Sequence, residues 1–436
     1  MTYEKCFPLI TKTIRNTHFS KPYITSEIKN LIKERNKLQR KSLKWPITYG
    51  KQYRKLRNQI NKMIQKEKSR YFKTKLEESK SDVRKSWSVI NEVLNRKTRD
   101  DSYPASALLT PDQFNEHFIN VGPSLSAKIT PPKTSFSSYL PTCTRETFSF
   151  RQCTITEIQN IIISLNDSAP GYDELPGKII KSTSNTLSPI ILSLYNRSLA
   201  LGVFPDPLNI AVVRPIYKSG DDTDLNNYRP ISVLNFLSKI FEKVAYTRLM
   251  EHLKQNNILS TCQYGFRPLR STETALQNFV DVVLTAFDEN KFTISVFLDL
   301  SKAFDTVDHT ILLNKLEHYG VRTTLKWFKS FITSRMQSVK LDKGFSSQCK
   351  TLCGIPQGSI LGPLLIILYI NDIVYSTQKL NFILYADDST LFTSHHNLTT
   401  LINTLNSELA QVSCWLAANK LTLNIKKNKI HDFTQK

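Results

Sequence analysis

Three aspartates in apolar surroundings are the residues of this chain best suited to carry chemistry. Asp387 and Asp388 stand side by side in FILYADDSTLF (382–392), and Asp299 comes near the end of the apolar run FTISVFLDL (292–300). Adjacent carboxylates repel one another unless a proton or a cation neutralises them, so the pair suggests a metal site. A hairpin turn is the simpler explanation, because aspartate favours turns and tolerates unusual backbone angles. From these residues alone, both interpretations stay open.

Two β-strands are predicted to carry these acids, over residues 292–300 and 380–388, because both runs are rich in β-branched and aromatic residues. Between them lie a helical stretch, DHTILLNKLEHYG (308–320), and CGIPQGSILGPLLIILYINDI (353–373), which reads as a glycine-containing loop followed by a buried helix. Since ligands in open α/β sheets gather at strand ends, we expect the acids to meet there. Carboxylates so placed suit Mg2+, and two such ions support phosphoryl transfer.

Positive charge is concentrated at the N-terminus. The 436 residues carry a formal charge of +22, and the first hundred hold 27 basic and 9 acidic residues. Such a segment favours a polyanion, most commonly nucleic acid. A membrane surface is the alternative, but no apolar run approaches the length of a membrane span and no signal peptide is evident. Seven scattered cysteines without a paired CxxC framework predict reduced thiols in an intracellular protein.

Changes of composition divide the chain into segments. Apolar residues recur at helical spacing through residues 26–80, with a break near Trp45-Pro46 and a restart after Gly50, so a basic helical region is predicted over 1–100. Its charge either binds nucleic acid directly or only solvates two amphipathic helices. Residues 101–150 are rich in Ser, Thr and Pro and predict a linker. A mixed helix and strand pattern follows from about residue 150.

Seven motifs in order resemble those of reverse transcriptases, in the wording of non-LTR (LINE-type) retrotransposon polymerases. The palm motifs are FLDLSKAFDTVDH (297–309), GIPQGSILGPLL (354–365) and LYADD (384–388). The finger motifs are SAPGYDELPGKIIK (168–181), VVRPIYKSGDDTDLNNYRPISVLNFLSKIFEKV (212–244) and QYGFRPLRSTETAL (263–276), and WLAANKLTLNIKKNK (415–429) resembles the element after the catalytic hairpin. A lone ADD would be weak evidence, whereas seven ordered motifs make chance negligible.

The resemblance implies a two-metal site. Asp299 and Asp387 would ligate both Mg2+ ions, with Asp388 assisting and the backbone carbonyl of Leu300 as a further ligand. Mn2+ is the alternative ion. The competing interpretation, that these acids serve only as caps and turns, loses most of its weight once three separate segments agree.

The resemblance also implies a nucleotide site. Phe304 would lie under the incoming sugar and exclude a 2'-hydroxyl, although a lone Phe is more often a core residue. Gln357 and Gly358 would line the nucleotide and template strand, the glycine by allowing close backbone approach. Lys218 and Arg229 would hold the triphosphate, the alternative being that both are surface charges.

Three neighbouring residues are assigned local roles. Asp305, Asp308 and His309 match the family's wording, but Asp308 is predicted to cap the helix that begins at His309. A lone histidine there is more often hydrogen-bonded structure than an acid-base group.

The fold that the resemblance implies is α+β, a right-hand polymerase with fingers over 151–290 and a palm over 291–436. The palm would be a ferredoxin-like antiparallel sheet backed by helices. Family members continue into a thumb and begin with an endonuclease domain, so we expect the thumb to be largely absent from this chain and the endonuclease to lie upstream in a full-length element.

The implied activity is RNA-directed DNA polymerase. Its partners would be template RNA, primer DNA and dNTPs, without a membrane, and its place of work the nucleus, with assembly in the cytoplasm. Two alternatives use the same residues: a truncated, non-catalytic nucleic-acid-binding remnant, and a two-metal nuclease. Extension, retention or shortening of a nucleic-acid strand distinguishes the three.

Overall fold

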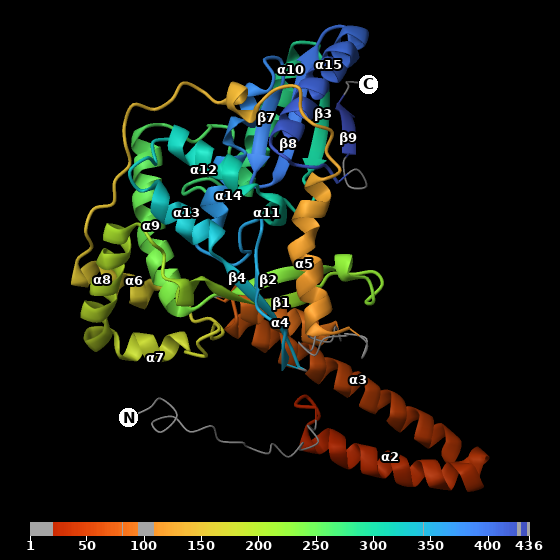
Figure 1. Ribbon diagram of the computed structural model, residues 1–436. Helices are drawn as coiled ribbons and strands as arrows, with labels where there is room; N and C mark the ends of the chain where they lie inside the picture. The colour runs from red at the N-terminus through yellow and green to blue at the C-terminus, as the bar shows by residue number, and fades with distance from the viewer. Residues whose placement is uncertain (1–20, 81, 95–108, 343, 425–428, 434–436) are drawn as a thin grey trace. The chain divides into compact units, whose positions relative to one another are not determined.

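The computed structural model describes residues 21–80, 82–94, 109–342, 344–424 and 429–433. The chain divides into two compact units, residues 1–103 and 104–436. In the first unit, α2 (Ser26–Lys44), α3 (Pro46–Glu78) and α4 (Val83–Val93) follow one another (Figure 1). The side chain of Thr25 caps α2, and Pro46 opens α3 at its first position, where its missing N–H costs nothing. The predicted restart after Gly50 therefore occurs earlier, directly after Trp45.

Two sheets form the framework of the second unit. One has the order β2-β1-β4-β5, with β6 also paired to β4, and the other has the order β7-β8-β3-β9 (Figure 1). In the first sheet β1 pairs with β2 antiparallel and with β4 parallel, whereas every pair in the second is antiparallel. The strands are β1 (Ile210–Tyr217), β2 (Tyr228–Val233), β3 (Phe292–Asp299), β4 (Met336–Leu341), β5 (Gly344–Phe345), β6 (Cys349–Lys350), β7 (Asn381–Tyr385), β8 (Asp388–His395) and β9 (Lys429–Phe433).

Helices surround both sheets. The α-helices are α5 (Pro111–Ser126), α6 (Ile155–Ser164), α7 (Gly177–Ser182), α8 (Ser184–Leu201), α9 (Phe236–Gln255), α10 (Thr272–Asp288), α11 (Ala303–Thr306), α12 (His309–His318), α13 (Leu325–Thr333), α14 (Gly362–Tyr369) and α15 (Leu398–Ala418). Short 3-10 turns are η1 (Phe136–Tyr139), η2 (Asp206–Asn209), η3 (Leu225–Asn227) and η4 (Asn371–Tyr375). Both α10 and α15 contact the sheet that contains β3.

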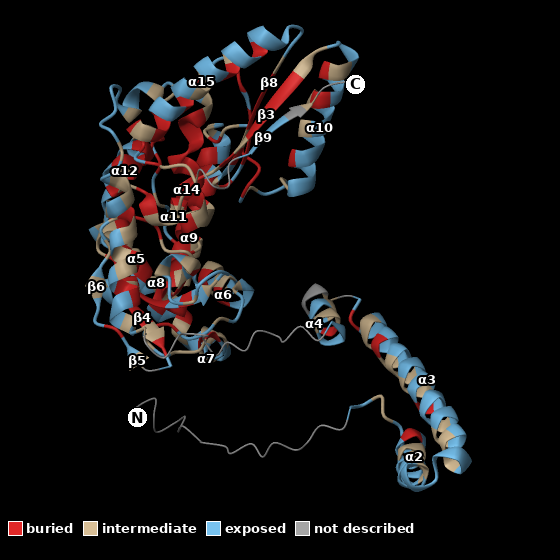
Figure 2. Cartoon of the chain, turned by 90° about the vertical axis from the view of Figure 1, so that its right-hand side faces the viewer, coloured by how far each residue is buried: buried red, intermediate tan, exposed pale blue. Residues whose placement is uncertain are grey.

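The core of the second unit lies around α14. Every residue of α14 except Pro363 is buried, as its uniformly apolar sequence predicts, and α9 is buried along most of its length (Figure 2). A buried ion pair anchors α12 to this core: Lys315 Nζ lies 2.5 Å from Asp372 Oδ1 and also donates to the carbonyl of Tyr369. Trp415 of α15 donates to the other carboxylate oxygen of Asp372. These contacts hold α12, η4 and α15 together beside the second sheet.

Helix α5 lies within the segment predicted to be a linker. Thr110 and Gln113 form a reciprocal capping box, and Pro111 stands at the first helical position. Phe114 is fully buried, 4.9 Å from the ring of Tyr228 on β2. The Ser/Thr/Pro-rich composition of 101–150 was therefore a poor guide over 110–126, because two of those residues, Thr110 and Pro111, start a helix.

The α+β class and the N-terminal helices agree with the prediction from sequence. Both predicted strands are present, and the predicted buried helix is α14. The second strand is shorter than predicted, because β7 ends at Tyr385 and Asp388 already begins β8. The predicted boundary at residue 290 does not separate the sheets, since β4 from the later segment pairs with β1 from the earlier one. Among the described helices, none is long and apolar enough to cross a membrane.

Candidate active site

The β7–β8 hairpin brings the three aspartates to one end of the second sheet. Tyr385 pairs with Asp388 across the hairpin, so Ala386 and Asp387 form a two-residue turn. On the other side of β8, Asp388 lies opposite Asp299 at the end of β3. Opposite residues of an antiparallel pair have Cα atoms only about 4.5–5.5 Å apart, so the three acids are close neighbours. The two interpretations of the DD pair are compatible, because a turn is what places Asp387 beside Asp299.

Buried Gln263 holds this turn from the edge of β7. Its Oε1 accepts hydrogen bonds from the backbone N–H of Ala386 at 3.1 Å and of Gly265 at 2.8 Å. Ala386 has a φ of 55°, a left-handed conformation that costs a non-glycine residue about 1–2 kcal/mol. Gly265 approaches so closely that a Cβ there would lie 2.2 Å from the nitrogen of Ala386. The turn is therefore fixed by contacts from a segment about 120 residues earlier in the chain.

The end of β3 is held by residues 422–424. Asn424 donates to the Oδ2 atom of Asp299 at 2.8 Å, and its backbone N–H donates to the carbonyl of the same residue. Ser301 in turn donates to the carbonyl of Thr422, so that Leu300 and Leu423 face each other in an isolated bridge. One oxygen of Asp299 is thus oriented by an amide, which fixes the direction of the other.

A cavity of about 640 Å³ unites most of the predicted site residues. Its lining includes seven of the nine: Lys218, Arg229, Asp299, Leu300, Phe304, Gln357 and Asp387. Asp388 and Gly358 are not among the lining residues. Asp388 is exposed at the start of β8, beside the cavity. Gly358 has a φ of 129°, and a Cβ there would lie 2.3 Å from the carbonyl oxygen of Ser232, so this glycine permits the loop to pack on β2.

The cations come from the first sheet. Lys218 directly follows β1 and donates its backbone N–H to Asn227, while Arg229 lies on β2 opposite Ile216. Because side chains alternate along a strand, Lys218 and Arg229 extend from the same face of this hairpin. The side chain of each is exposed at the cavity. Opposite charges from two sheets therefore line one cavity.

Helix α5 and Lys302 complete the wall, and sequence reasoning missed both. His117, Asn120 and Lys128 from α5 and the residues after it line the cavity, and the capping box was the local signal that could have revealed this helix. Lys302 stands in the left-handed region, with a φ of 49°, just before α11. Burial lowers the pKa of its amine, and nearby Asp305 opposes that shift. Lys128 and Lys302 therefore add two cations to Lys218 and Arg229 in the cavity lining.

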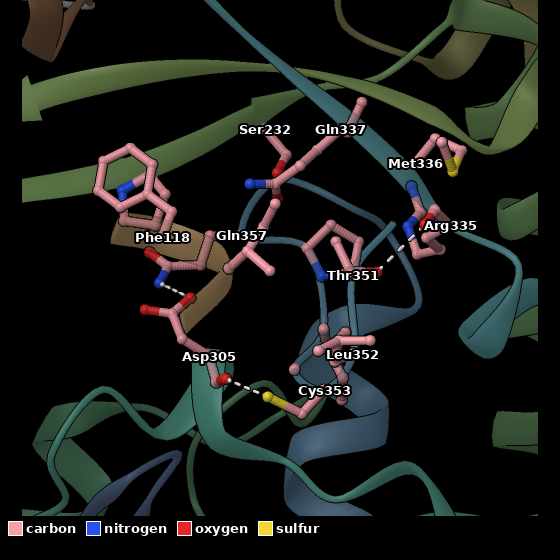
Figure 3. Close-up of a pocket in the computed structure, with 16 residues that line it drawn as sticks. Phe118, Ser232, Asp305, Arg335, Met336, Gln337, Thr351, Leu352, Cys353 and Gln357 are labelled. Atoms are coloured by element: carbon pink, nitrogen blue, oxygen red, sulfur yellow. Dashed lines mark hydrogen bonds between the residues drawn. The ribbon is translucent and has the colours of Figure 1, made fainter. Parts of the chain in front are cut away.

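The loop that carries Gln357 is bonded to the α11 segment. Ile355 donates its backbone N–H to the carbonyl of Phe304 at 2.7 Å, and Gly354 donates to the carbonyl of Val307 at 2.8 Å. The Nε2 atom of Gln357 donates to Oδ1 of Asp305 at 3.0 Å, as Figure 3 shows. These hydrogen bonds fix the segment that contains Phe304 against the loop that contains Gln357.

Two of the neighbouring residues have the local roles that their sequence predicted. The side chain of Asp308 accepts from the N–H of Ile311 and caps α12. Its other oxygen lies 2.6 Å from the amine of Lys420, and this contact and the cap hold the pKa of the carboxyl below its usual value, against the opposing effect of burial. His309 is buried and bonds to the carbonyl of Gly354.

The acids fit a metal site that substrate completes. Among the described residues, no three His, Cys, Asp or Glu side chains are grouped as a ready metal cluster. Mg2+, however, usually takes one or two carboxylates together with waters and substrate phosphates. Asp299 and Asp387 at the cavity, with Asp388 adjacent, match the carboxylate part of that donor set.

A family model and several known proteins are similar to this chain, and their descriptions agree with one another. A family model described as "Reverse transcriptase (RNA-dependent DNA polymerase)" matches residues 216–434, half of the chain. The chain is 31% identical over 224 residues to the "Probable RNA-directed DNA polymerase from transposon X-element" of Drosophila melanogaster, covering 51% of this chain and 24% of that protein.

Two further relatives from Drosophila melanogaster are similar over longer stretches. The "RNA-directed DNA polymerase from mobile element jockey" is 26% identical over 398 residues, 86% of this chain and 43% of the relative. The "Probable RNA-directed DNA polymerase from transposon BS" is 29% identical over 297 residues, 65% of this chain and 32% of the relative. The chain thus spans less than half the length of each of these proteins.

Proposed function

Because the chain belongs to the reverse transcriptase (RNA-dependent DNA polymerase) family, related to the polymerases of non-LTR retrotransposons, we propose that it extends a DNA primer on an RNA template. The observation that carries this proposal is one cavity lined both by aspartates from one sheet and by Lys218 and Arg229 from the other. A nucleoside triphosphate needs both: cations for its phosphates and carboxylates for the metal ions that accompany them.

In this proposal the sheet β7-β8-β3-β9 is the ferredoxin-like palm, and the region that contains β1 and β2 belongs to the fingers. The assignment of fingers to 151–290 and palm to 291–436 needs one amendment, because β4 pairs with β1 and α5 contributes a wall. The basic helices α2, α3 and α4 are proposed to add salt-sensitive affinity for nucleic acid. The element's nuclear location is part of the same proposal.

Each cavity residue has a proposed task. Asp299 and Asp387 would hold two Mg2+ ions, or Mn2+ in their place, assisted by Asp388 and the carbonyl of Leu300. When bound, such ions would supply activation of the primer 3'-hydroxyl and charge stabilisation of the leaving pyrophosphate. Lys218 and Arg229 bind the triphosphate, with Lys302 as an additional cation. The ring of Phe304 excludes a 2'-hydroxyl, while Gln357 lines the nucleotide and Gly358 shapes the loop that carries it.

Primer extension by the Asp387→Ala variant tests this function. We expect kcat to fall by at least about 1,000-fold, because loss of a metal ligand removes several kcal/mol of transition-state stabilisation. RNA binding and its dependence on salt should remain nearly unchanged. The matched control is Asp281→Ala, which removes an exposed acid of α10 and should leave extension unaltered.

Product analysis decides between this function and its two rivals. A wild-type chain that retains template without extending the primer would be the non-catalytic remnant. Shortened strands would indicate the nuclease. Undiminished extension by Asp387→Ala would contradict the site assignment.

A further inference from the structure

Residues 419–424 leave the end of α15 and run along the end of β3, where two of the proposed metal ligands stand. Leu423 lies opposite Leu300 in an isolated antiparallel bridge. Asn424 makes two hydrogen bonds to Asp299, each 2.8 Å long: its backbone N–H donates to the carbonyl oxygen, and its side-chain Nδ2 donates to Oδ2. This short segment therefore contacts both Asp299 and Leu300, whose backbone carbonyl is the other proposed ligand at this end of the strand.

The other end of this segment is bonded to the start of α12. Lys420 Nζ lies 2.6 Å from Oδ2 of Asp308, whose Oδ1 caps the helix. The hydroxyl of Tyr369 bridges the same two parts of the chain, because it donates to the carbonyl of Asn419 at 2.6 Å and accepts from the backbone N–H of Asp308 at 3.4 Å. Two contacts thus join Asp308 to the turn at Lys420, 112 positions later in the chain.

The path from this anchor to Asn424 leaves the backbone little freedom. Lys420 adopts the left-handed conformation, with a φ of 53°. The next residue, Leu421, is buried and donates its backbone N–H to the carbonyl of Leu416 at 2.9 Å. Only two residues separate Leu421 from Asn424. Because hydrogen bonds fix the segment at both ends, we expect a shift of Lys420 to move the amide of Asn424.

We propose that Asn424 is a positioning residue for the metal site, and that the Asp308–Lys420 ion pair sets the place of its amide. This inference rests on the metal-dependent polymerase function proposed above. The χ2 torsion of an aspartate is broad, so an unsupported carboxylate samples many rotations, whereas Mg2+ demands near-ideal ligand geometry. A neutral amide donor restricts that rotation and leaves the carboxylate its full charge for the metal, which a lysine or arginine in the same place would partly neutralise.

The Asn424→Leu variant removes the amide donor and keeps a side chain of similar size, while the backbone hydrogen bond to Asp299 stays. Its Mg2+ affinity should fall roughly tenfold or more, the usual effect of losing a hydrogen bond to a metal ligand. The measurement is the rise in melting temperature of the whole chain as Mg2+ is added, with dATP present and no primer. The Mg2+ concentration at which this rise begins reports the affinity, so a loss of stability alone would not mimic the effect. An unchanged Mg2+ affinity would overturn the positioning role.

Two further variants calibrate this measurement. Asp387→Ala removes a proposed metal ligand and should abolish the rise, whereas a rise that persists would contradict the proposed metal site and this inference with it. Asn256→Leu is the matched control, because its amide donates a half-buried hydrogen bond of 2.9 Å to the carbonyl of His252, outside the cavity lining. Its Mg2+ affinity should equal that of wild type, and a loss as large as that of Asn424→Leu would overturn the positioning role.

Lys420 and Asn424 should act as one unit in a double-mutant cycle. Lys420→Met keeps the length of the side chain but loses the ion pair, and Mg2+ affinity should fall roughly threefold. In the Asn424→Leu background the same change should have no further effect, since the amide through which it acts is gone. Lys181→Met, which breaks the ion pair of α7 with Asp167, is the matched control and should leave Mg2+ affinity unchanged. Independent losses in the double variant, or no loss in Lys420→Met, would overturn the role of the ion pair.

Primer extension by the same proteins separates this inference from the polymerase proposal. In Asn424→Leu, the Mg2+ concentration needed for half-maximal extension should rise about as much as in the binding measurement. If the wild-type chain extends no primer but Asn424→Leu still weakens Mg2+ binding, the polymerase proposal alone is contradicted. If the wild-type chain extends a primer and both chains bind Mg2+ equally well, the positioning role alone is contradicted.

Discussion

Two hairpins deliver opposite charges to one cavity, and they are built in different ways. The β7–β8 hairpin turns in two residues, is gripped by buried Gln263, and holds Ala386 in a left-handed conformation. The β1–β2 hairpin instead spans ten residues between Tyr217 and Tyr228, mostly exposed and organised by its own side chains. The acids are fixed by distant parts of the chain, whereas the cations lie at the base of a self-contained loop.

The difference in construction matches the roles that we propose for the two sets of charges. Mg2+ requires ligands at about 2.0–2.1 Å in near-octahedral geometry, so its carboxylates tolerate little displacement. A lysine or arginine that neutralises a phosphate acts over a longer range and on a flexible stem. We expect the acidic hairpin to be sensitive to small changes of backbone and the basic hairpin to be tolerant of them.

The largest contrast should come from inserting one glycine into each hairpin. Between Ala386 and Asp387, the insertion displaces an acid by up to about 3 Å, and kcat should fall at least roughly 100-fold, since even 1 Å of misplacement can cost that much. Between Gly220 and Asp221, the same insertion should alter kcat/KM by no more than about threefold. Similar losses from both insertions in primer extension would refute the contrast.

Removing a cation should have a smaller effect and a different kinetic form. Arg229→Ala is expected to raise KM for dNTP roughly 10-fold, because a charge-assisted hydrogen bond contributes about 1.5–3 kcal/mol, with little change of kcat. Steady-state extension at varied dNTP concentration measures this. Arg214→Ala on β1, an exposed arginine outside the cavity lining, is the control. A loss confined to kcat in Arg229→Ala would show that the cation acts on chemistry and not on binding.

The next largest difference between the hairpins should be in the free energy of unfolding that is lost when one supporting side chain is replaced. Gln263→Met keeps the side chain's length but leaves the N–H groups of Ala386 and Gly265 without their acceptor, which should lower the free energy of unfolding by about 1–3 kcal/mol. Asn227→Ala in the other hairpin removes one exposed hydrogen bond to the carbonyl of Asp221 and should cost under about 1 kcal/mol. Urea unfolding measures the free energy of unfolding of both variants. Equal losses would contradict the view that Gln263 stabilises its hairpin more than Asn227 stabilises the other.

The smallest effect concerns backbone strain alone. Ala386→Gly relieves the left-handed conformation but adds chain entropy to the unfolded state, so unfolding free energy should rise by no more than about 1 kcal/mol. Gly220→Ala, at a φ of 103°, should lower it. A loss of stability in Ala386→Gly would mean that the alanine methyl group contributes packing that outweighs the strain.

Local sequence patterns predicted the strands, the buried helix and the candidate acids, but not the long-range hydrogen bonds that fix the acids in position. The apolar runs before Asp299 and Asp387 predicted two strands, and the uniformly apolar stretch at 362–369 predicted a buried helix, because each pattern is contained in a short window. Gln263 and Asn424 were missed, since each acts on a residue more than 120 positions away. Side-chain contacts of that range leave no periodic signal.

Because long-range contacts leave no signal in a short window, the contacts of Asp305 and Gly358 could not be predicted either. A short motif predicted Gly358 as a nucleotide-lining residue, which stays a prediction, but it could not show that the carbonyl of Ser232 on β2 fills the position of a Cβ there. Asp305 was given a local role, although its partner Gln357 lies in a separate motif. Motifs identify which residues matter to a family, and only the packing between segments shows which contacts each of those residues makes within the fold.

Helix α5 also bears on where a stably folding fragment of the second unit can begin. The family match starts at residue 216, but residues 117–128 form part of the cavity wall, and Phe114 fills a space against Tyr228. A fragment cut to the family boundary would expose that aromatic surface to water and open the cavity on one side. The smallest piece of the second unit that keeps this wall therefore begins about a hundred residues upstream of the family match, and a shortened chain would retain it only when its first residue falls before Thr110.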